Sequence, residues 1–153
     1  MTSYYDKLRA ERKQLQEQDL LPSWFTTAGY QLFKEKYQWA DTPRKQYETI
    51  AATLAAHTDD APKWREKFFS LLWSGWLSPS TPVLANTGTT RGLPVSCSGG
   101  YIPDSIDGFY KARREAALLT KHGFGTSGYL GDVRARGRSI SAGGKASGVV
   151  PVL

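Results

Sequence analysis

Glycine is distributed very unevenly along these 153 residues, and this feature constrains the fold more than any other. Thirteen of the 15 glycines and five of the eight prolines lie after residue 78. Glycine and proline favour turns and interrupt helices, whereas the residues before this point are mostly charged, helix-favouring or aromatic. The sequence therefore predicts a helical region at residues 1–77 and a turn-rich second region at residues 78–153.

Two helix starts stand out in the first region. Thr42 followed by Pro43 is a good N-cap and first-turn pair, and Asp60 with Pro62 opens the next helix in the same way. This second helix has apolar side chains at helical spacing. They are Trp64, Phe68, Leu71, Leu72 and Trp76. Such a face predicts core or interface packing rather than a cofactor site.

One clear helix interrupts the second region. Asp104 and Ser105 cap the stretch "IDGFYKARREAALLTKH", and Gly123 stands at the position that ends a helix in a left-handed conformation. The expected apolar face comprises Ile106, Phe109, Tyr110, Ala116 and Ala117. A glycine-rich, basic run follows this helix, and we expect it to end in a short apolar strand at "VVPVL".

Size and composition indicate an ordinary folded chain. Hydrophobic residues make up 40% of the sequence, which is enough to bury a core in one domain of this length. No apolar run approaches the roughly 20 residues needed to span a bilayer, and the first residues have no apolar stretch like that of a signal peptide. With a single cysteine, we expect a reducing cytoplasmic compartment.

The charge fits an anionic partner, but on charge alone a mildly basic surface is the favoured interpretation. The formal net charge is +6, which fits a nucleotide or nucleic acid as well as a mildly basic surface. Arg134, Arg136 and Arg138 alternate, so in an extended segment their guanidiniums would face one side and could bind a polyphosphate together. Lys121, at the end of the preceding helix, could join them. A solvated basic strand and a nucleic-acid contact are the alternatives.

Familiar cofactor patterns are missing from the sequence. The glycines of "HGFGTSGYLG" follow a helix instead of opening one, so they do not match a dinucleotide-binding fingerprint, and no P-loop pattern is present. One cysteine and the distant His57 and His122 cannot build a zinc site. The sequence therefore predicts no bound metal or cofactor.

The lone cysteine, Cys97, lies between Ser96 and Ser98, and two glycines follow. A free cysteine is often a buried filler, since it is among the most buried residue types. However, these neighbours offer hydroxyls and backbone amides more than apolar packing. The setting therefore also fits a thiol that is brought close to a small polar ligand.

The order of motifs resembles the catalytic (large) subunit of ribonucleotide reductase. The resemblance rests on "LSPSTPVLANTGTTRGLPVSCSGGYIPDSIDGFY", "LLTKHGFGTSGYLGDVRARGRSI" and "ASGVVPVL", and it covers roughly residues 70–153. Residues 1–69 are similar only in being helical, and nothing in them resembles the family's ATP-cone domain. "GFGTSGYLG" differs from the common Gly-Gly-Gly-Ile-Gly pattern and resembles a compact, phage-like branch of the family.

The resemblance implies an α/β fold in which a helical N-terminal region precedes a ten-stranded α/β barrel. Residues 78–153 would form the first part of that barrel, with the specificity-site helix and loop. The family's radical cysteine and second redox cysteine lie beyond Leu153. We therefore expect a split subunit, inactive alone, that assembles with a companion chain carrying the rest of the barrel. One segment of an interrupted or truncated gene is the alternative.

The resemblance also implies roles for individual residues. Cys97 matches the first redox cysteine, and Thr81 and Ser96 match positions that bind the substrate's phosphates and ribose. The residues that match the allosteric effector site are Asp104, Ser105, Lys121 and Arg134. Some members have an arginine near Ser141, so Arg136 or Arg138 is expected to take over its phosphate contact.

The implied partners are a ribonucleotide substrate, a deoxynucleotide or ATP effector, and further subunits in an oligomer. The radical source would lie outside this chain, as a metal-radical small subunit or adenosylcobalamin. Two other functions are open: a non-catalytic, deoxynucleotide-binding regulatory module and a nucleic-acid-binding domain built on the "RARGR" loop.

Overall fold

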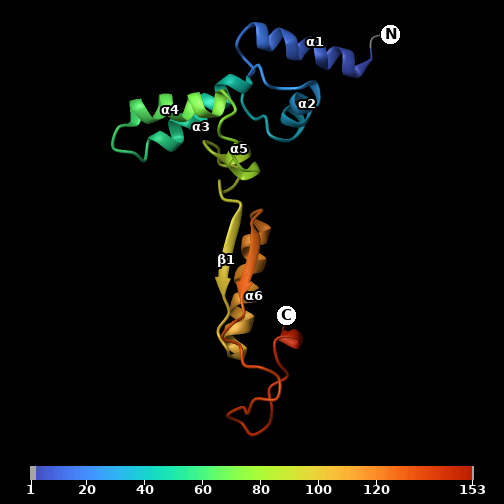
Figure 1. Ribbon diagram of the computed structural model, residues 1–153, viewed down its shortest axis with the longest axis vertical. Coiled ribbons are helices and arrows are strands. Elements are labelled where there is room, and N and C mark those ends of the chain that lie inside the picture. Colours follow the sequence, from blue (N-terminus) through green and yellow to red (C-terminus); the bar gives the residue numbers. More distant parts are fainter. Residues whose placement is uncertain (1–2, 153) are drawn as a thin grey trace. The chain divides into compact units, whose positions relative to one another are not determined.

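The computed structural model describes residues 3–152, and it divides into two compact units, Met1–Val95 and Ser96–Leu153. Unit 1 contains only helices, and unit 2 contains a helix and two strands (Figure 1). The change in composition after residue 77 falls within unit 1. The domain boundary expected there stays a prediction.

Unit 1 has five described helices. Their bounds are α1 Tyr4–Glu17, α2 Thr27–Lys36, α3 Pro43–Ala55, α4 Ala61–Trp73 and α5 Thr81–Asn86. Thr42 and Asp60 are the N-caps of α3 and α4, and the side chain of each accepts a hydrogen bond from the backbone N–H three residues later. The predicted helix starts are therefore confirmed.

The core of unit 1 is aromatic and aliphatic, and α3 and α4 lie side by side around it (Figure 1). Its buried members are Leu8, Leu21, Phe25, Tyr30, Phe33, Tyr47, Ile50 and Leu72. Phe33 and Tyr47 stack with ring centroids 6.1 Å apart. Such burial supplies the main driving force for folding this unit.

The expected apolar face of α4 is only partly correct. Leu72 is buried, but Trp76 is 86% exposed because the helix ends at Trp73 and Gly75 takes a left-handed φ of 79°. Phe69 and Trp73, which are outside the predicted set, pack against the core instead. The helix thus ends before Trp76, and the face that it turns to the core includes Phe69 and Trp73 in addition to Leu72.

Gln46 fixes the position of α5 within unit 1. This side chain is fully buried on α3, and its Nε2 donates to the carbonyl oxygens of Tyr37 and Leu84, each at 2.9 Å. Its Oε1 accepts from the backbone N–H of Trp39 at 3.0 Å. Since Leu84 belongs to α5, these bonds tie the short helix that begins with Thr81 to the core.

Unit 2 is built on a strand–helix–strand motif. Strand β1, Cys97–Tyr101, pairs in parallel with β2, Gly125–Tyr129, so that Cys97 lies opposite Gly125. Helix α6, Ile106–Lys121, connects them and packs against both (Figure 1). The Ser105 hydroxyl caps α6 by accepting from the Gly108 N–H at 3.0 Å, and Gly123 has a φ of 88°. The predicted helix and both its ends are confirmed.

The buried stripe of α6 differs from the predicted one. Ile106 and Tyr110 are 70% and 68% exposed. The side chains of α6 that lie partly buried follow helical spacing. They are Phe109, Ala112, Ala116 and Leu119. The contacts of α6 with the two strands thus select one of two apolar stripes on the helix.

The chain after β2 forms turns and a small hairpin. Ser139 and Lys145 form an antiparallel bridge, and the backbone reverses direction at Gly143 and Gly144, both of which have positive φ. The apolar strand expected at "VVPVL" is wrong, since Val150–Val152 is a 3-10 helix. Pro151 has no N–H to donate to a neighbouring strand, which disfavours pairing there.

Candidate functional site

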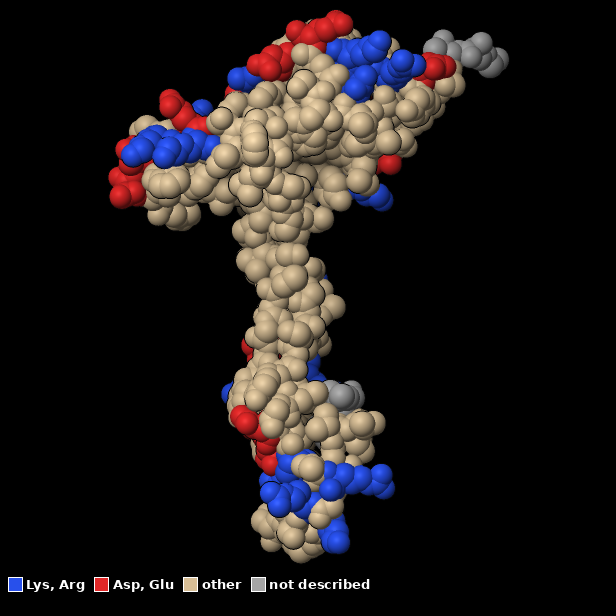
Figure 2. Space-filling model, viewed as in Figure 1, with Lys and Arg blue, Asp and Glu red and all other residues tan. Residues whose placement is uncertain are grey.

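A hollow of about 460 Å³ lies in unit 2, between the start of α6 and the loop that follows β2. Its polar lining comes from Asp104 and Ser105 at the helix start, Arg134 in the loop, and Ser141, Lys145 and Ser147 around the hairpin. Basic side chains gather at this end of unit 2 (Figure 2). The volume is within the range of small-ligand sites.

An ion pair joins two of the predicted effector residues across this hollow. Arg134 Nε donates to Asp104 Oδ2 at 2.6 Å, and Arg134 Nη2 lies 3.5 Å from the Asp104 carbonyl oxygen. Both side chains remain partly accessible, at 38% for Arg134 and 25% for Asp104. The pair can therefore offer an acceptor and several donors to a ligand that enters the hollow.

Ser105 contributes the N-terminus of α6 to the hollow. Its hydroxyl is engaged as the helix cap, and the first amides of a helix together carry a partial positive charge. At Gly108, an added Cβ would approach Pro103 and its carbonyl oxygen to 2.8 Å. Because Gly108 has no side chain, the segment at Pro103 can pack closely against the first turn of α6. This packing places Asp104 beside the start of the helix.

Cys97 is exposed at the first position of β1. Its cross-strand neighbour, Gly125, has no side chain, and the Gly125 N–H donates to the Ser96 carbonyl oxygen at 2.8 Å. Both strands lack charged residues and are largely exposed. Within the described residues the thiol of Cys97 is therefore accessible.

Comparisons with known proteins bear directly on this arrangement. The family model for the ribonucleotide reductase all-alpha domain matches residues 23–92, and that for the ribonucleotide reductase barrel domain matches residues 95–153. Together these matches cover most of the chain, in the order that the family has. The chain belongs to the ribonucleotide reductase large-subunit family.

Named relatives agree with this family. The ribonucleoside-diphosphate reductase subunit alpha of Helicobacter pylori is 33% identical over 114 residues, which is 74% of this chain and 14% of that protein. The large chain of Encephalitozoon cuniculi is 30% identical over 145 residues, or 90% of this chain and 18% of that protein. This chain thus spans less than a fifth of the length of these curated relatives.

A solved structure confirms the fold class. The class Id ribonucleotide reductase alpha subunit of Actinobacillus ureae matches with a TM-score of 0.67 and 29% identity, over 85% of this chain and 24% of that one. The helical N-terminal region followed by the start of the ribonucleotide reductase barrel is therefore confirmed. The βαβ motif of unit 2 is the described part of that barrel.

The predicted effector residues do not all come together in this chain. Lys121 is the last residue of α6, whose 16 residues at about 1.5 Å each span about 24 Å, so it lies far from Asp104 at the other end. It does not line the hollow. The role of Lys121 in effector binding stays a prediction.

The expectation that Arg134, Arg136 and Arg138 share one side of an extended segment is wrong. Arg136 and Gly137 form a turn, and Gly137 has a left-handed φ of 87°. Arg136 lines a separate hollow of about 720 Å³, next to Gly148 and Val150. Arg138 lines neither hollow. A glycine within an alternating basic run is the signal that could have warned of this turn.

Substrate-site residues are divided between the units. Thr81, the exposed first residue of α5, belongs to unit 1, whereas Ser96 and Cys97 belong to unit 2. The substrate site that the resemblance implies stays a prediction.

Two exposed tyrosines at the carboxyl ends of the strands were not singled out in the sequence. Tyr101 and Tyr129 stack with ring centroids 6.3 Å apart, and the Tyr101 hydroxyl donates to Asp132 Oδ2 at 2.8 Å. This hydrogen bond to a carboxylate raises the pKa of Tyr101. Each strand ends in a tyrosine, and the parallel register that places Tyr101 opposite Tyr129 brings the two rings together. The sequence contains no signal for that register.

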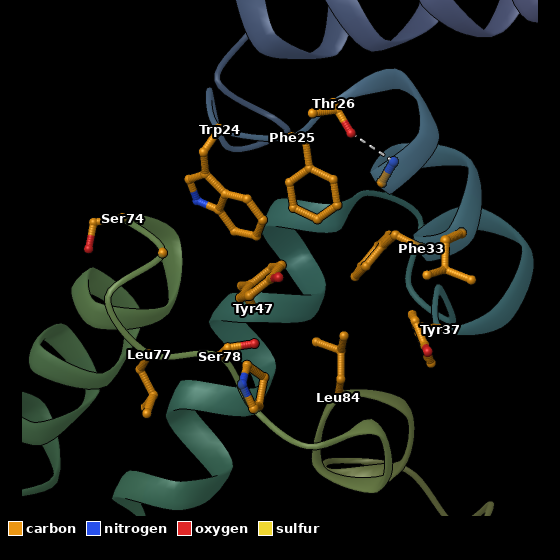
Figure 3. Close-up of a pocket in the computed structure, with 14 residues that line it drawn as sticks. Trp24, Phe25, Thr26, Phe33, Tyr37, Tyr47, Ser74, Leu77, Ser78 and Leu84 are labelled. Carbon is orange, nitrogen blue, oxygen red and sulfur yellow. Dashed lines mark hydrogen bonds between the residues drawn. The ribbon is translucent and has the colours of Figure 1, made fainter.

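Unit 1 contains a hollow of its own, about 580 Å³, lined by aromatic and aliphatic side chains (Figure 3). Trp24 and Phe25 stack on one side at 4.3 Å, and Leu77 and Leu84 lie on the other. Burial raises the pKa of Tyr47 in its wall to about 12. Because none of its described lining residues is charged, this hollow is unsuited to binding phosphate.

Residues 3–152 contain neither a metal-ligand cluster nor a membrane-spanning helix. No three His, Cys, Asp or Glu side chains come together there as metal ligands. Within the same described range, every helix is too short or too polar to cross a bilayer.

Proposed function

We propose that this chain is the N-terminal component of a ribonucleotide reductase catalytic subunit, which reduces ribonucleotides to deoxyribonucleotides by thiyl-radical chemistry. In this proposal Cys97 is one of two redox thiols, and Thr81 and Ser96 bind the substrate. The hollow at Asp104 and Arg134 binds the allosteric effector. The radical comes from outside the chain, from a metal-radical small subunit or adenosylcobalamin.

The exposed thiol of Cys97 is the observation that carries this proposal. Replacing the 2′-hydroxyl of a ribose by hydrogen releases water and consumes two electrons and two protons. Two thiols supply these as they close to a disulfide. Since Cys97 is the single cysteine of the sequence, the second thiol must come from another polypeptide or from outside this stretch of the family's sequence.

The exposure of the sheet supports the need for a companion chain. Parallel strands are normally covered on both faces. Here the residues of β2 are all exposed, and those of β1 nearly all. We therefore propose that further barrel sequence covers these strands in the working enzyme, that a companion polypeptide supplies it, and that the chain is inactive without it.

The test is reconstitution. The tagged chain is purified from its native source, and a co-purifying polypeptide with barrel sequence and cysteines is combined with recombinant chain for a reductase assay with a dithiol reductant. We expect wild-type chain to support turnover and Cys97→Ser to abolish it. Lys13→Gln, an exposed change in unit 1, serves as the control. Full turnover with Cys97→Ser would rule out the redox role.

A non-catalytic, deoxynucleotide-binding module is the second candidate. It is favoured by one observation: the hollow at Asp104 and Arg134 is formed within unit 2 alone. This candidate predicts that the isolated chain binds deoxynucleotides and that reductase activity never appears with any co-purified polypeptide. Calorimetry with the isolated chain and its Arg134→Ala variant tests the binding, and unchanged affinity would remove Arg134 from the site.

A further inference from the structure

The charges around the hollow of unit 2 do not balance. Its lining contains three charged side chains: Asp104, Arg134 and Lys145. Asp104 and Arg134 form an ion pair at 2.6 Å, so their charges largely compensate each other. Among the described lining residues, Lys145 is the cation that has no ion pair within 4.0 Å. The net positive charge of the hollow therefore comes from Lys145.

The hairpin holds the backbone of Lys145 on both sides. The residue after it, Ala146, donates to the Arg138 carbonyl at 2.8 Å and accepts from the Gly137 N–H at 2.9 Å. The residue before it, Gly144, accepts from the Ile140 N–H at 3.1 Å. Lys145 itself bridges to Ser139. The hairpin therefore fixes the backbone of Lys145 at the edge of the hollow, and the flexible side chain extends from that position.

The other basic residues of the loop do not line this hollow. Arg136 packs against Gly148, where an added Cβ would lie 3.1 Å from the Arg136 Cβ. It lines an adjoining hollow that shares Ala146, Ser147 and Gly148 with the first one. Arg138 lines neither hollow. Among the described residues, Lys145 is therefore the cation without an ion pair that lines the same hollow as Arg134.

We propose that Lys145 is a phosphate ligand of this hollow and that it binds the outer phosphates of a nucleoside triphosphate. This inference rests on the proposed effector function of the hollow and adds a residue that the sequence pattern did not indicate. Charge-assisted hydrogen bonds from a cation to phosphate are stronger than those from neutral donors, and the Arg134 guanidinium is already paired with a carboxylate. The ammonium of Lys145 can supply a further positive charge, and Ser141 and Ser147 also line the hollow.

The test compares nucleotides that differ only in their number of phosphates. Isothermal titration calorimetry is performed on the full 153-residue chain with each of the four deoxynucleoside triphosphates. The monophosphate of the tightest binder is then measured. Lys145→Gln removes the charge, Lys145→Arg keeps it, and Lys111→Gln on α6 is the matched control, since Lys111 is exposed and lines none of the described hollows. Circular dichroism confirms that each variant is folded.

We expect Lys145→Gln to weaken triphosphate binding on the order of tenfold, the size typical of a lost hydrogen bond to a charged group. Binding of the monophosphate should change less than twofold, and Lys145→Arg should retain most of the affinity. If Lys145→Gln binds the triphosphate as tightly as Lys111→Gln does, the role of Lys145 is overturned, while the effector function of the hollow still stands. If the wild-type chain binds none of the triphosphates, the effector function of the hollow fails, and the role of Lys145 fails with it.

Discussion

Replacing Gln46 by leucine should destabilise unit 1, because three backbone groups depend on this buried amide. The Trp39 N–H and the Tyr37 carbonyl each lose their described partner, whereas the Leu84 carbonyl keeps a bond from Trp39 Nε1 at 3.2 Å. A buried backbone group left unpaired costs about 1–3 kcal/mol. Since Trp39 and Tyr37 are half-buried, the lower half of that range applies to each.

Leucine buries more apolar carbon than the glutamine stem that it replaces, which returns about 1 kcal/mol of this loss at ~0.8 kcal/mol per buried CH₂. We therefore expect Gln46→Leu to lower the free energy of unfolding by about 2 kcal/mol. Urea denaturation followed by tryptophan fluorescence measures this change selectively, because all five tryptophans lie in unit 1. The control is Gln14→Leu, an exposed glutamine on α1 whose side chain has no described hydrogen bond.

A loss below about 0.5 kcal/mol, no larger than that expected for an exposed substitution, would refute the reasoning. It would mean that water or a shift of α5 satisfies the freed groups. The result matters for the proposed function, because α5 begins with Thr81. Two described side-chain hydrogen bonds hold α5 at the Leu84 carbonyl, one from Gln46 on α3 and one from Trp39 in the segment before α3. A loosened α5 should also weaken any substrate contact made by Thr81.

Two further predictions concern accessibility and pH. Cys97 should react with one equivalent of iodoacetamide in the native chain, at a rate within about tenfold of the urea-unfolded chain, because the thiol is exposed; protection in mass spectrometry would contradict this. Unit 1 should lose stability as the pH rises from 10 to about 12, because burial raises the pKa of Tyr47 to about 12 and only the unfolded chain then ionises. Tyr47 contributes about 2 kcal/mol of this loss at the upper end. Burial and a hydrogen bond to Glu11 also raise the pKa of Tyr30, so Tyr47→Phe should reduce the loss without removing it.

Some site residues could be predicted from sequence and others could not. Asp104 and Arg134 were predicted from the resemblance, and the structure brings them into contact at 2.6 Å. Lys145 was missed because its place depends on the hairpin that pairs residues 139 and 145. The common side expected for Arg136 and Arg138 assumed an extended backbone, which the left-handed Gly137 prevents.

The sequence by itself determined the helix starts and stops. Thr42, Asp60 and Ser105 each cap a helix through an amide only three residues away, and Gly123 ends α6 through its own backbone freedom. These effects are local, so a pattern of neighbouring residues is sufficient to predict them. The order of motifs also determined the family.

Only the tertiary structure decided which apolar stripe of α6 is buried, which aromatic residues of α4 join the core, and which cation shares a hollow with Arg134. Phe109 is partly buried and lines the hollow of unit 2, while Tyr110, one position later, is 68% exposed. Both residues fit an apolar helical face, so spacing could not distinguish them. The choice is made by contacts between segments far apart in the chain, and no local pattern specifies these contacts.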